Sequence, residues 1–468
     1  MKEQKDSMPR IAAAPESCLK LVSIYVSDNH PLLQLKRALD WEAIRAVMVK
    51  HWRKAGKNVD GGPGLPWPVE LYVPLVVLLL VKVYHSRQME EHLRENVVAR
   101  LFMGLEQQLE AQIRDHANIA RAVEALGVAG IAEVNQLIVK QVQALGLSST
   151  EVLSSDTTVQ EPAIGYPNEP GILKGLAERC ERALRKLHKR GAKGAAEAIE
   201  KAKEIYRLVK EHHLFARGKE AKDELLEQMI AQTRELIAQA EQVIKQIGRL
   251  GGRVAASARS KLREMSEVAK MLLPQIEQWM KTGLVAKGKI IHAGLREARA
   301  IVKRYGGKKV RFGYKWLIHR LKGGYLFGKR VEATADERQM PLESLNDYRE
   351  VFGLEQTPEM SVYDRGGSTP KTIQKLREEG VSKVGIPPRG KAAWPVEAED
   401  QLKVKSERGK TEGSIGTLKS KKYGLSHRQE RRTETQSAAG QRSICSLNLN
   451  LLMRDLSRAR KAAGAAQV

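Results

Sequence analysis

One long block of helix-forming residues constrains the architecture of this chain more than any other feature. Residues 172–304 are dominated by Ala, Glu, Lys, Gln and Leu, and their apolar side chains recur at helical spacing. Strand-forming residues are concentrated on both sides of this block, at 152–160 and in an alternating pattern at 328–335. We therefore expect one α/β domain that is interrupted by a helical insertion, either two or three long helices folded back on each other or a coiled coil.

The same patterns divide the chain into six segments. The predicted boundaries are an N-terminal extension at 1–32, an all-helical DNA-binding domain at 33–145, the first part of an α/β core at 146–171, the helical insertion at 172–304, the remainder of the core at 305–456, and a disordered tail at 457–468.

Charge and composition favour a nucleic-acid partner. The chain has 80 Lys and Arg against 55 Asp and Glu, a net charge of +25. A protein this basic usually binds a polyanion, because Lys and Arg contact phosphates. Its three widely spaced cysteines argue against a zinc site or a disulfide framework, and the apolar run at 71–81 is too short for a membrane span of about 20 residues. We expect a cytoplasmic protein that does not enter a membrane.

Three acidic residues stand where metal-dependent DNA chemistry would need them. Two metal ions can stabilise both the attacking and the leaving oxygen of a phosphodiester, and Mg²⁺ prefers carboxylate ligands. Asp156 lies in the first strand-forming run, Asp364 ends a predicted strand at 360–364, and Glu412 lies on a predicted helix at 401–419. If the two strands are neighbours, the aspartates converge and Glu412 approaches from a helix packed on the sheet.

Each acid also has an ordinary explanation. An Asp at a strand end is more often a turn or cap residue, and a Glu on a basic helix is usually an ion-pair partner. Asp336, which follows the strand at 328–335, is a weaker candidate ligand, and Asp347 is weaker still.

The motifs around these acids are more specific together than separately. They resemble, in the same order, the three acidic segments of bacterial insertion-sequence DDE transposases. The matching segments are 155–161 (SDTTVQE) with Tyr166-Pro167, 362–367 (VYDRGG), and 412–420 (EGSIGTLKS) with Tyr423-Gly424. Residues 64–66, 90–96 and 100–105 resemble the helical N-terminal domain of that family, and residues 441–443 with Asn448 and Asn450 its C-terminal helix.

The resemblance implies a ribonuclease-H-like catalytic core that binds two Mg²⁺ or Mn²⁺ ions. Asp156, Asp364 and Glu412 would then be both the catalytic residues and the metal ligands. Such a transposase cleaves double-stranded DNA at the transposon ends and transfers the 3′-OH to target DNA, usually as a homodimer. In a bacterial cytoplasm it would be associated with the nucleoid when bound to DNA.

Basic residues near the acids are candidate DNA contacts: Arg365, Arg408, Lys410, Lys419 and Lys421. Arg408, Glu412 and Lys419 match a motif of related cut-and-paste transposases, in which three residues separate Arg from Glu and six separate Glu from Lys. Lys405 stands where that motif has Tyr, so no stacking role is carried over. The insertion also departs from many relatives, because it lies between the two aspartates rather than between the second Asp and the Glu.

A second basic stretch, residues 281–331, combines 15 Lys and Arg with one acid and interleaved aromatic residues. It is expected to follow a DNA backbone and stack on bases, although the aromatics would face the core if the stretch is only a basic surface. Two other functions stay open. The chain could be a ribonuclease-H-like nuclease without strand transfer, or a non-catalytic DNA-end-binding protein derived from a transposase.

Overall fold

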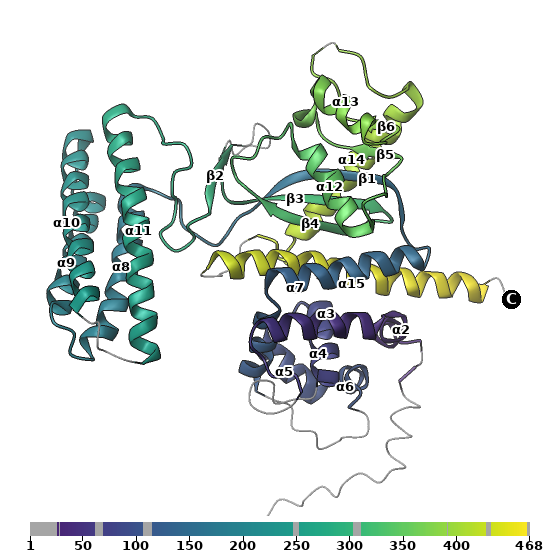
Figure 1. Cartoon of the computed structure of the whole chain (residues 1–468), viewed down its shortest axis with the longest axis horizontal. Coiled ribbons are helices and arrows are strands. Elements are labelled where there is room, and N and C mark those ends of the chain that lie inside the picture. Colours follow the sequence, from purple (N-terminus) through teal and green to yellow (C-terminus); the bar gives the residue numbers. More distant parts are fainter. Residues whose placement is uncertain are drawn as a thin grey trace, which may run out of the picture.

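The computed structural model is mostly helical and contains one mixed sheet (Figure 1). It describes residues 26–27, 29–60, 69–105, 115–246, 252–302, 310–390, 392–426 and 432–465. Most of the predicted N-terminal extension, the loop at 64–66 and the last three residues of the predicted tail lie outside these ranges.

The N-terminal domain is all-helical. Its helices are α2 (Pro31–Ala38), α3 (Trp41–Lys54), α4 (Val69–Lys82), α5 (Ser86–Glu95), α6 (Val97–Met103) and α7 (His116–Ala144). Helix α4 is apolar on every side and is buried against α3, α6, α7 and α15 (Thr433–Ala465). Helix α7 is broken at Gly127, whose φ of 64° is easily reached only by a residue without a Cβ.

Helix α7 is also long and apolar enough to cross a membrane, and within the described ranges it is the only single helix that is. Helices α4 and α5 would pass the same test as one span, but they are bent by 104°. Half of the most apolar window of α7 is buried inside the protein, where α7 packs on α3 and α15. Its apolar side chains are therefore used in the core of this domain.

The sheet has six strands: β1 (Ser149–Gln160), β2 (Arg299–Val302), β3 (Val310–Lys322), β4 (Leu326–Val331), β5 (Met360–Val362) and β6 (Lys383–Gly385). The order is β2-β3-β1-β5-β6, with β4 also paired to β3. Strand β1 runs antiparallel to β3 and parallel to β5. One long central strand therefore joins an antiparallel half of the sheet to a parallel half.

Helices cover both faces of this sheet. They are α12 (Met340–Phe352), the 3-10 helix η1 (Arg365–Gly367), α13 (Pro370–Glu378) and α14 (Ala398–Lys419). Leu153 of β1 packs with Tyr348 and Val351 of α12. Its neighbour Val152 packs with Val404 of α14. Because successive side chains of a strand point to opposite faces, α12 and α14 lie on opposite sides of the sheet.

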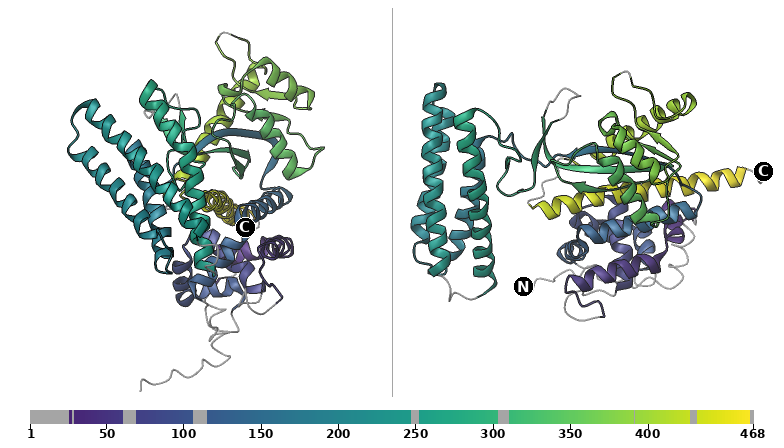
Figure 2. Two further views of the ribbon diagram at one scale, coloured as in Figure 1. Left: turned by 60° about the vertical axis from the view of Figure 1, so that its left-hand side comes forward. Right: turned by 45° about the horizontal axis from the view of Figure 1, so that its top comes forward.

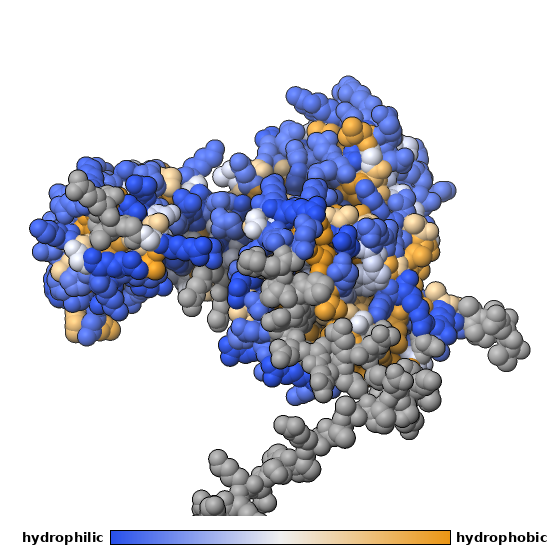
Figure 3. Space-filling view, turned by 60° about the horizontal axis from the view of Figure 1, so that its bottom comes forward, coloured by the Kyte–Doolittle hydropathy of each residue, from blue (hydrophilic) through white to orange (hydrophobic). Residues whose placement is uncertain are grey.

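A separate helical bundle enters the chain between β1 and β2. It consists of α8 (Glu169–His188), α9 (Ala195–Leu214), α10 (Gly218–Gln246) and α11 (Arg253–Thr282). Its apolar side chains form a core of their own. The bundle stands beside the sheet rather than on it (Figure 2), and its visible surface is mostly hydrophilic (Figure 3).

The predicted limits of this insertion, 172–304, were wrong at both ends. Helix α8 starts at Glu169, where the side chain of Asn168 caps the first turn. The bundle ends at Thr282, and residues 299–302 form β2. The Ala- and Arg-rich composition around β2 favours a helix, but pairing of Ala300 and Ile301 with β3 overrides that local preference.

Helix α15 lies between the N-terminal domain and the sheet (Figure 1). It packs on α2, α4, α7 and β4. The buried Asn448 accepts a hydrogen bond from the backbone N–H of Leu326 (2.8 Å) and donates to Asn135 of α7 (2.8 Å). The prediction that residues 457–468 are disordered was wrong as far as residue 465, because α15 continues to Ala465.

Aromatic residues of the 281–331 stretch do not form a stacking surface. Tyr314, Trp316, Tyr325 and Phe327 are all buried, and the indole of Trp316 donates to Gln160 Oε1 at 2.8 Å. The stretch contains β3, whose alternating basic and aromatic side chains were not recognised as a strand of the core. Phe312 is only partly buried, and Tyr305 lies outside the described residues.

Close packing of α15 on β3 predicts opposite effects for two glycine substitutions. A Cβ on Gly440 would lie 2.2 Å from Cζ2 of Trp316, so Gly440→Ala should lower the free energy of unfolding by about 1–3 kcal/mol. Gly409 in α14 is exposed with open space around it, so Gly409→Ala should stabilise by about 1 kcal/mol. Urea denaturation of both variants tests this packing, and a shift in the same direction for both would contradict it.

Candidate functional site

Asp156 lies within β1, and Asp364 lies two residues beyond the end of the neighbouring parallel strand β5. Strands β1 and β5 are paired in register, with Ser154 opposite Val362. Each aspartate lies two residues further along its chain. Because strand side chains alternate, both carboxylates share the sheet face of Ser154 and Val362. Asp156 is partly exposed among buried neighbours, so this end of the face opens to the surface.

Helix α14 covers that face and brings Glu412 with it. Thr411 donates a hydrogen bond to the Ser154 hydroxyl (2.6 Å), which donates to the Glu407 carbonyl (3.4 Å). Val404, two turns before Thr411, packs on β1 and β5. Glu412 follows the buried Thr411 directly, but its own side chain is 64% exposed and lies 3.8 Å from Arg408.

The spacing of Arg408, Glu412 and Lys419 places all three on one side of α14. At 100° per residue, positions four and eleven residues apart differ by only about 40° and 20° around the helix axis. This row runs along the edge of the buried stripe of α14, so its side chains border the sheet instead of entering the core.

Backbone hydrogen bonds orient both aspartates. Asp156 Oδ1 accepts from the N–H of Thr157 at 2.7 Å, and Asp364 Oδ1 accepts from the N–H of Gly366 at 2.6 Å. Asp364 thereby caps η1. The donor set is all carboxylate, which suits Mg²⁺ or Mn²⁺. The oxygens of Asp156, Asp364 and Glu412 do not all lie within 4.8 Å of one another, and the Glu412 carboxylate lies 3.8 Å from Arg408.

The two weaker candidate ligands, Asp336 and Asp347, form ion pairs with basic residues. Asp336 pairs with Arg338 (2.7 Å), and hydrogen bonds from Arg338 lower the pKa of its carboxyl. Asp347 is buried on the α12 face, where it bonds to His319 (2.9 Å) and Lys329 (2.6 Å). Burial opposes ionisation of Asp347, but these two partners outweigh it and lower its pKa.

His319 extends this contact into a buried Ser-His-Asp chain. Its Nδ1 lies 2.9 Å from the hydroxyl of Ser155, and its Nε2 faces Asp347. The arrangement has the connectivity of a nucleophilic triad. His319 is fully buried and Ser155 is 4% exposed, so no substrate reaches the hydroxyl. We interpret the chain as a hydrogen-bond network that fixes α12 on the sheet.

The predicted DNA contacts are not all equally available. Arg365 and Lys421 are exposed, and Arg408 and Lys419 are partly exposed. Lys410 is paired with Glu407 at 2.7 Å. Arg389 was not predicted: it donates to the carbonyls of Arg365 (3.3 Å) and Gly366 (2.7 Å) and so holds the turn after Asp364. Only tertiary structure reveals this role, because Arg389 lies in an unremarkable loop.

Glu407, also missed from the sequence, forms a buried ion pair with Arg320 of β3 at 2.8 Å. Their side chains are 9% and 11% exposed. Burial lowers the pKa of Arg320, and Glu407 opposes that shift. Of the two glutamates in the middle of α14, Glu407 is therefore a structural residue and Glu412 is the one that faces solvent.

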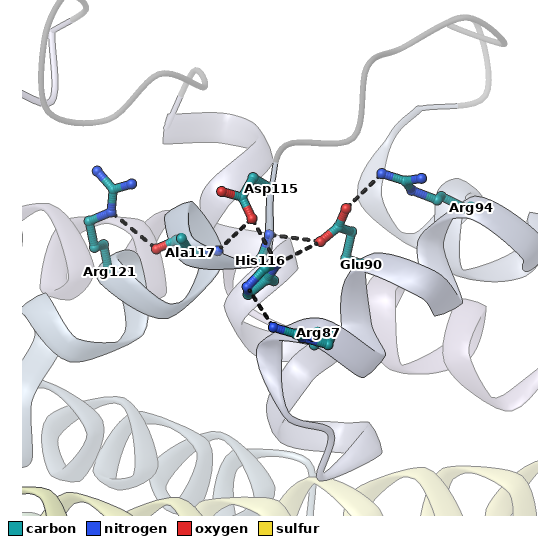
Figure 4. Close-up of polar contacts among 7 residues, drawn as sticks. All are labelled: Arg87, Glu90, Arg94, Asp115, His116, Ala117 and Arg121. Carbon is teal, nitrogen blue, oxygen red and sulfur yellow. Dashed lines mark hydrogen bonds and ion pairs between the residues drawn. The ribbon is translucent and has the colours of Figure 1, made fainter.

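A second acidic group lies in the N-terminal domain. Ligand atoms of Glu90, Asp115 and His116 lie within 4.8 Å of one another, the one such group of three found in the described ranges (Figure 4). Glu90 already pairs with Arg94 (2.6 Å) and accepts from the N–H of His116 (2.9 Å). This cluster caps α7 and joins it to α5, and its arginine partner already supplies the positive charge that a cation would bring.

Comparison with known proteins bears on the N-terminal domain. Residues 22–125 match a family model described as Transposase domain (DUF772). This part of the chain is therefore similar to a transposase domain. No curated protein and no solved structure matches the sequence. The match spans α2 to α6 and the start of α7, and it supports a transposase-related function; the sheet and the three acids lie beyond it.

The different environments of the two glutamates give a direct prediction. Glu407→Gln breaks a buried ion pair and leaves Arg320 without its partner, so it should cost about 3–5 kcal/mol of stability. Glu412→Gln, at an exposed position, should change stability by less than about 0.5 kcal/mol. Denaturant unfolding measures both, and similar losses for the two variants would contradict this division.

Proposed function

We propose that this protein is a DDE-type DNA transposase with a ribonuclease-H-like catalytic core. Asp156, Asp364 and Glu412 are its catalytic acids. The observation that supports the proposal most is the parallel register of β1 and β5, because Asp156 and Asp364 each follow the paired Ser154 and Val362 by two residues, on the face that α14 covers. The mixed sheet and the transposase-domain match in the N-terminal region support the same function.

The carboxylates fit Mg²⁺ or Mn²⁺ in type, and we propose that they bind two such ions. Asp156 comes from within β1, Asp364 follows β5, and Glu412 comes from α14, the helix packed over that face. Bound there, the metals would stabilise charge on the attacking and leaving oxygens of a phosphodiester. Asp156 and Asp364 are held in place by backbone hydrogen bonds, whereas Glu412 is free to move on an exposed helix edge.

The reaction has two steps of the same kind. Water attacks the phosphorus at the transposon end, the bond to the 3′ oxygen breaks, and a 3′-OH and a 5′-phosphate are released. The freed 3′-OH then attacks a phosphodiester of target DNA and displaces another 3′ oxygen. We propose that Arg365, Arg408, Lys419 and Lys421, which are exposed or partly exposed, contact phosphates and orient the DNA for both steps.

The partner is double-stranded DNA, at both the transposon end and the target. Joining two ends requires two sites, so we propose a homodimer acting in the bacterial cytoplasm on the nucleoid. The four-helix bundle stands beside the sheet, and we propose its surface for contact with DNA or with the second subunit (Figure 2). Two alternatives, a nuclease without strand transfer and a non-catalytic end-binding protein, give different outcomes in the test below.

The test uses a duplex that carries the terminal repeat read from DNA flanking the gene, with Mg²⁺ and a supercoiled target plasmid. Asp156→Asn, Asp364→Asn and Glu412→Gln should each slow end cleavage by more than about 100-fold, the scale for losing a group that stabilises transition-state charge. All three variants should still bind the duplex in a gel-shift assay.

Glu399→Gln is the matched control, because Glu399 is exposed on the same helix and far from the sheet end that carries Asp156. Equal cleavage by the control and the three variants would contradict the assignment. Cleavage without plasmid joining would favour the nuclease. Binding without cleavage by the wild type would favour the end-binding protein.

A further inference from the structure

One carboxylate links the two strands on the sheet face opposite the aspartates. Glu337 lies in the loop between β4 and α12. Its Oε1 accepts a hydrogen bond from the Thr157 hydroxyl at 2.9 Å, and its Oε2 accepts one from the Tyr363 hydroxyl at 2.7 Å. Thr157 follows Asp156 directly in the chain, and Tyr363 directly precedes Asp364. Glu337 therefore bridges the nearest neighbours of both aspartates.

This bridge lies where the backbone pairing has ended. The β1–β5 ladder joins residues 152–154 to residues 360–362 and does not extend to the aspartates. Beyond it, β1 continues through Asp156 to Gln160 beside β3, whereas Asp364 has left β5 and caps η1. Side-chain hydrogen bonds from Thr157 and Tyr363 to one acceptor supply a link at this level, so the spacing of the aspartates depends on Glu337.

Glu337 is itself fixed by a third strand. Lys315 of β3 is 5% exposed and forms an ion pair with Glu337 Oε1 at 2.8 Å. The same ammonium donates to the carbonyl of Ala335 at 2.9 Å, which holds the loop that carries Glu337. Both carboxylate oxygens of Glu337 thus have strong donors on the α12 face. Its charge is already paired, and it is turned away from the metal-binding face.

We propose that Glu337 is a positioning residue that sets the separation of Asp156 and Asp364, and through it the affinity of the site for divalent metal. It acts through Thr157 and Tyr363 and touches neither metal nor DNA. The proposal rests on the proposed function, because it assumes that the two aspartates bind metal. When residues that orient metal ligands without binding the metal are replaced, metal affinity or activity typically changes by 10–100-fold.

The test is a Mn²⁺ titration of the full chain followed by electron paramagnetic resonance, with thermal unfolding measured on the same samples. Glu337→Gln keeps the size of the side chain but removes the charge and one acceptor. Tyr363→Phe removes one arm of the bridge alone. Both variants should bind Mn²⁺ at least about 10-fold more weakly than the wild type, and excess Mn²⁺ should largely restore end cleavage.

Glu332→Gln is the matched control, because Glu332 is an exposed glutamate of the same loop; it should bind Mn²⁺ like the wild type. A lower melting temperature with unchanged Mn²⁺ affinity in both bridge variants would overturn the proposal and leave Glu337 a purely structural residue. If Glu337→Gln does not fold, Tyr363→Phe decides the question alone.

Asp156→Asn in the same titration separates the two claims. Loss of Mn²⁺ binding in Asp156→Asn with no change in the bridge variants would reject the role of Glu337 alone. No Mn²⁺ binding by the wild type, or unchanged binding in Asp156→Asn, would reject the proposed metal site and the positioning role with it.

Discussion

The parallel pairing of β1 with β5 is the constraint on which the candidate site depends. A shift of one residue in that register would turn one aspartate to the α12 face and separate the pair, because strand side chains alternate. The register is held by apolar contacts on both faces, Val152 with Val404 of α14 on one and Leu153 with α12 on the other. The apolar packing that fixes this register thus also determines that Asp156 and Asp364 share the α14 face.

The two faces of the sheet carry different groups of polar residues. The α14 face carries the candidate acids, and the buried pair of Arg320 and Glu407 holds the helix that supplies the third one. The α12 face contains polar networks around His319 and Glu337 that end on residues adjacent to the aspartates. Buried polar groups must be fully paired to be tolerated, so these networks restrict how the strands can sit. The aspartates accept backbone hydrogen bonds, whereas the Glu412 side chain is exposed beside Arg408.

Sequence alone identified Asp156, Asp364 and Glu412 as candidates because their flanking motifs resemble a known family, and it placed a helical insertion between strands. It could not identify Glu337, Arg389 or Glu407, whose partners are distant in the chain and carry no local signal. For residues 281–331, basic side chains interleaved with aromatics predicted base stacking, but Tyr314, Trp316, Tyr325 and Phe327 are buried around the central strand β3. Contact of the basic residues with a DNA backbone stays a prediction. The sequence did not indicate β2, because the composition of this segment favours a helix. Its strand conformation depends on pairing with β3, which is a tertiary contact.

The central claim is that segments around residues 156, 364 and 412 bind the same metal ions. Replacing Mg²⁺ with Fe²⁺ and adding ascorbate and peroxide generates radicals that cut the peptide backbone close to the bound iron, and mass spectrometry maps the cuts. The account predicts three groups of cuts, around 156, 364 and 412, all suppressed by excess Mg²⁺. Cuts confined to residues near Glu90 and His116, or scattered along the chain without Mg²⁺ competition, would contradict it.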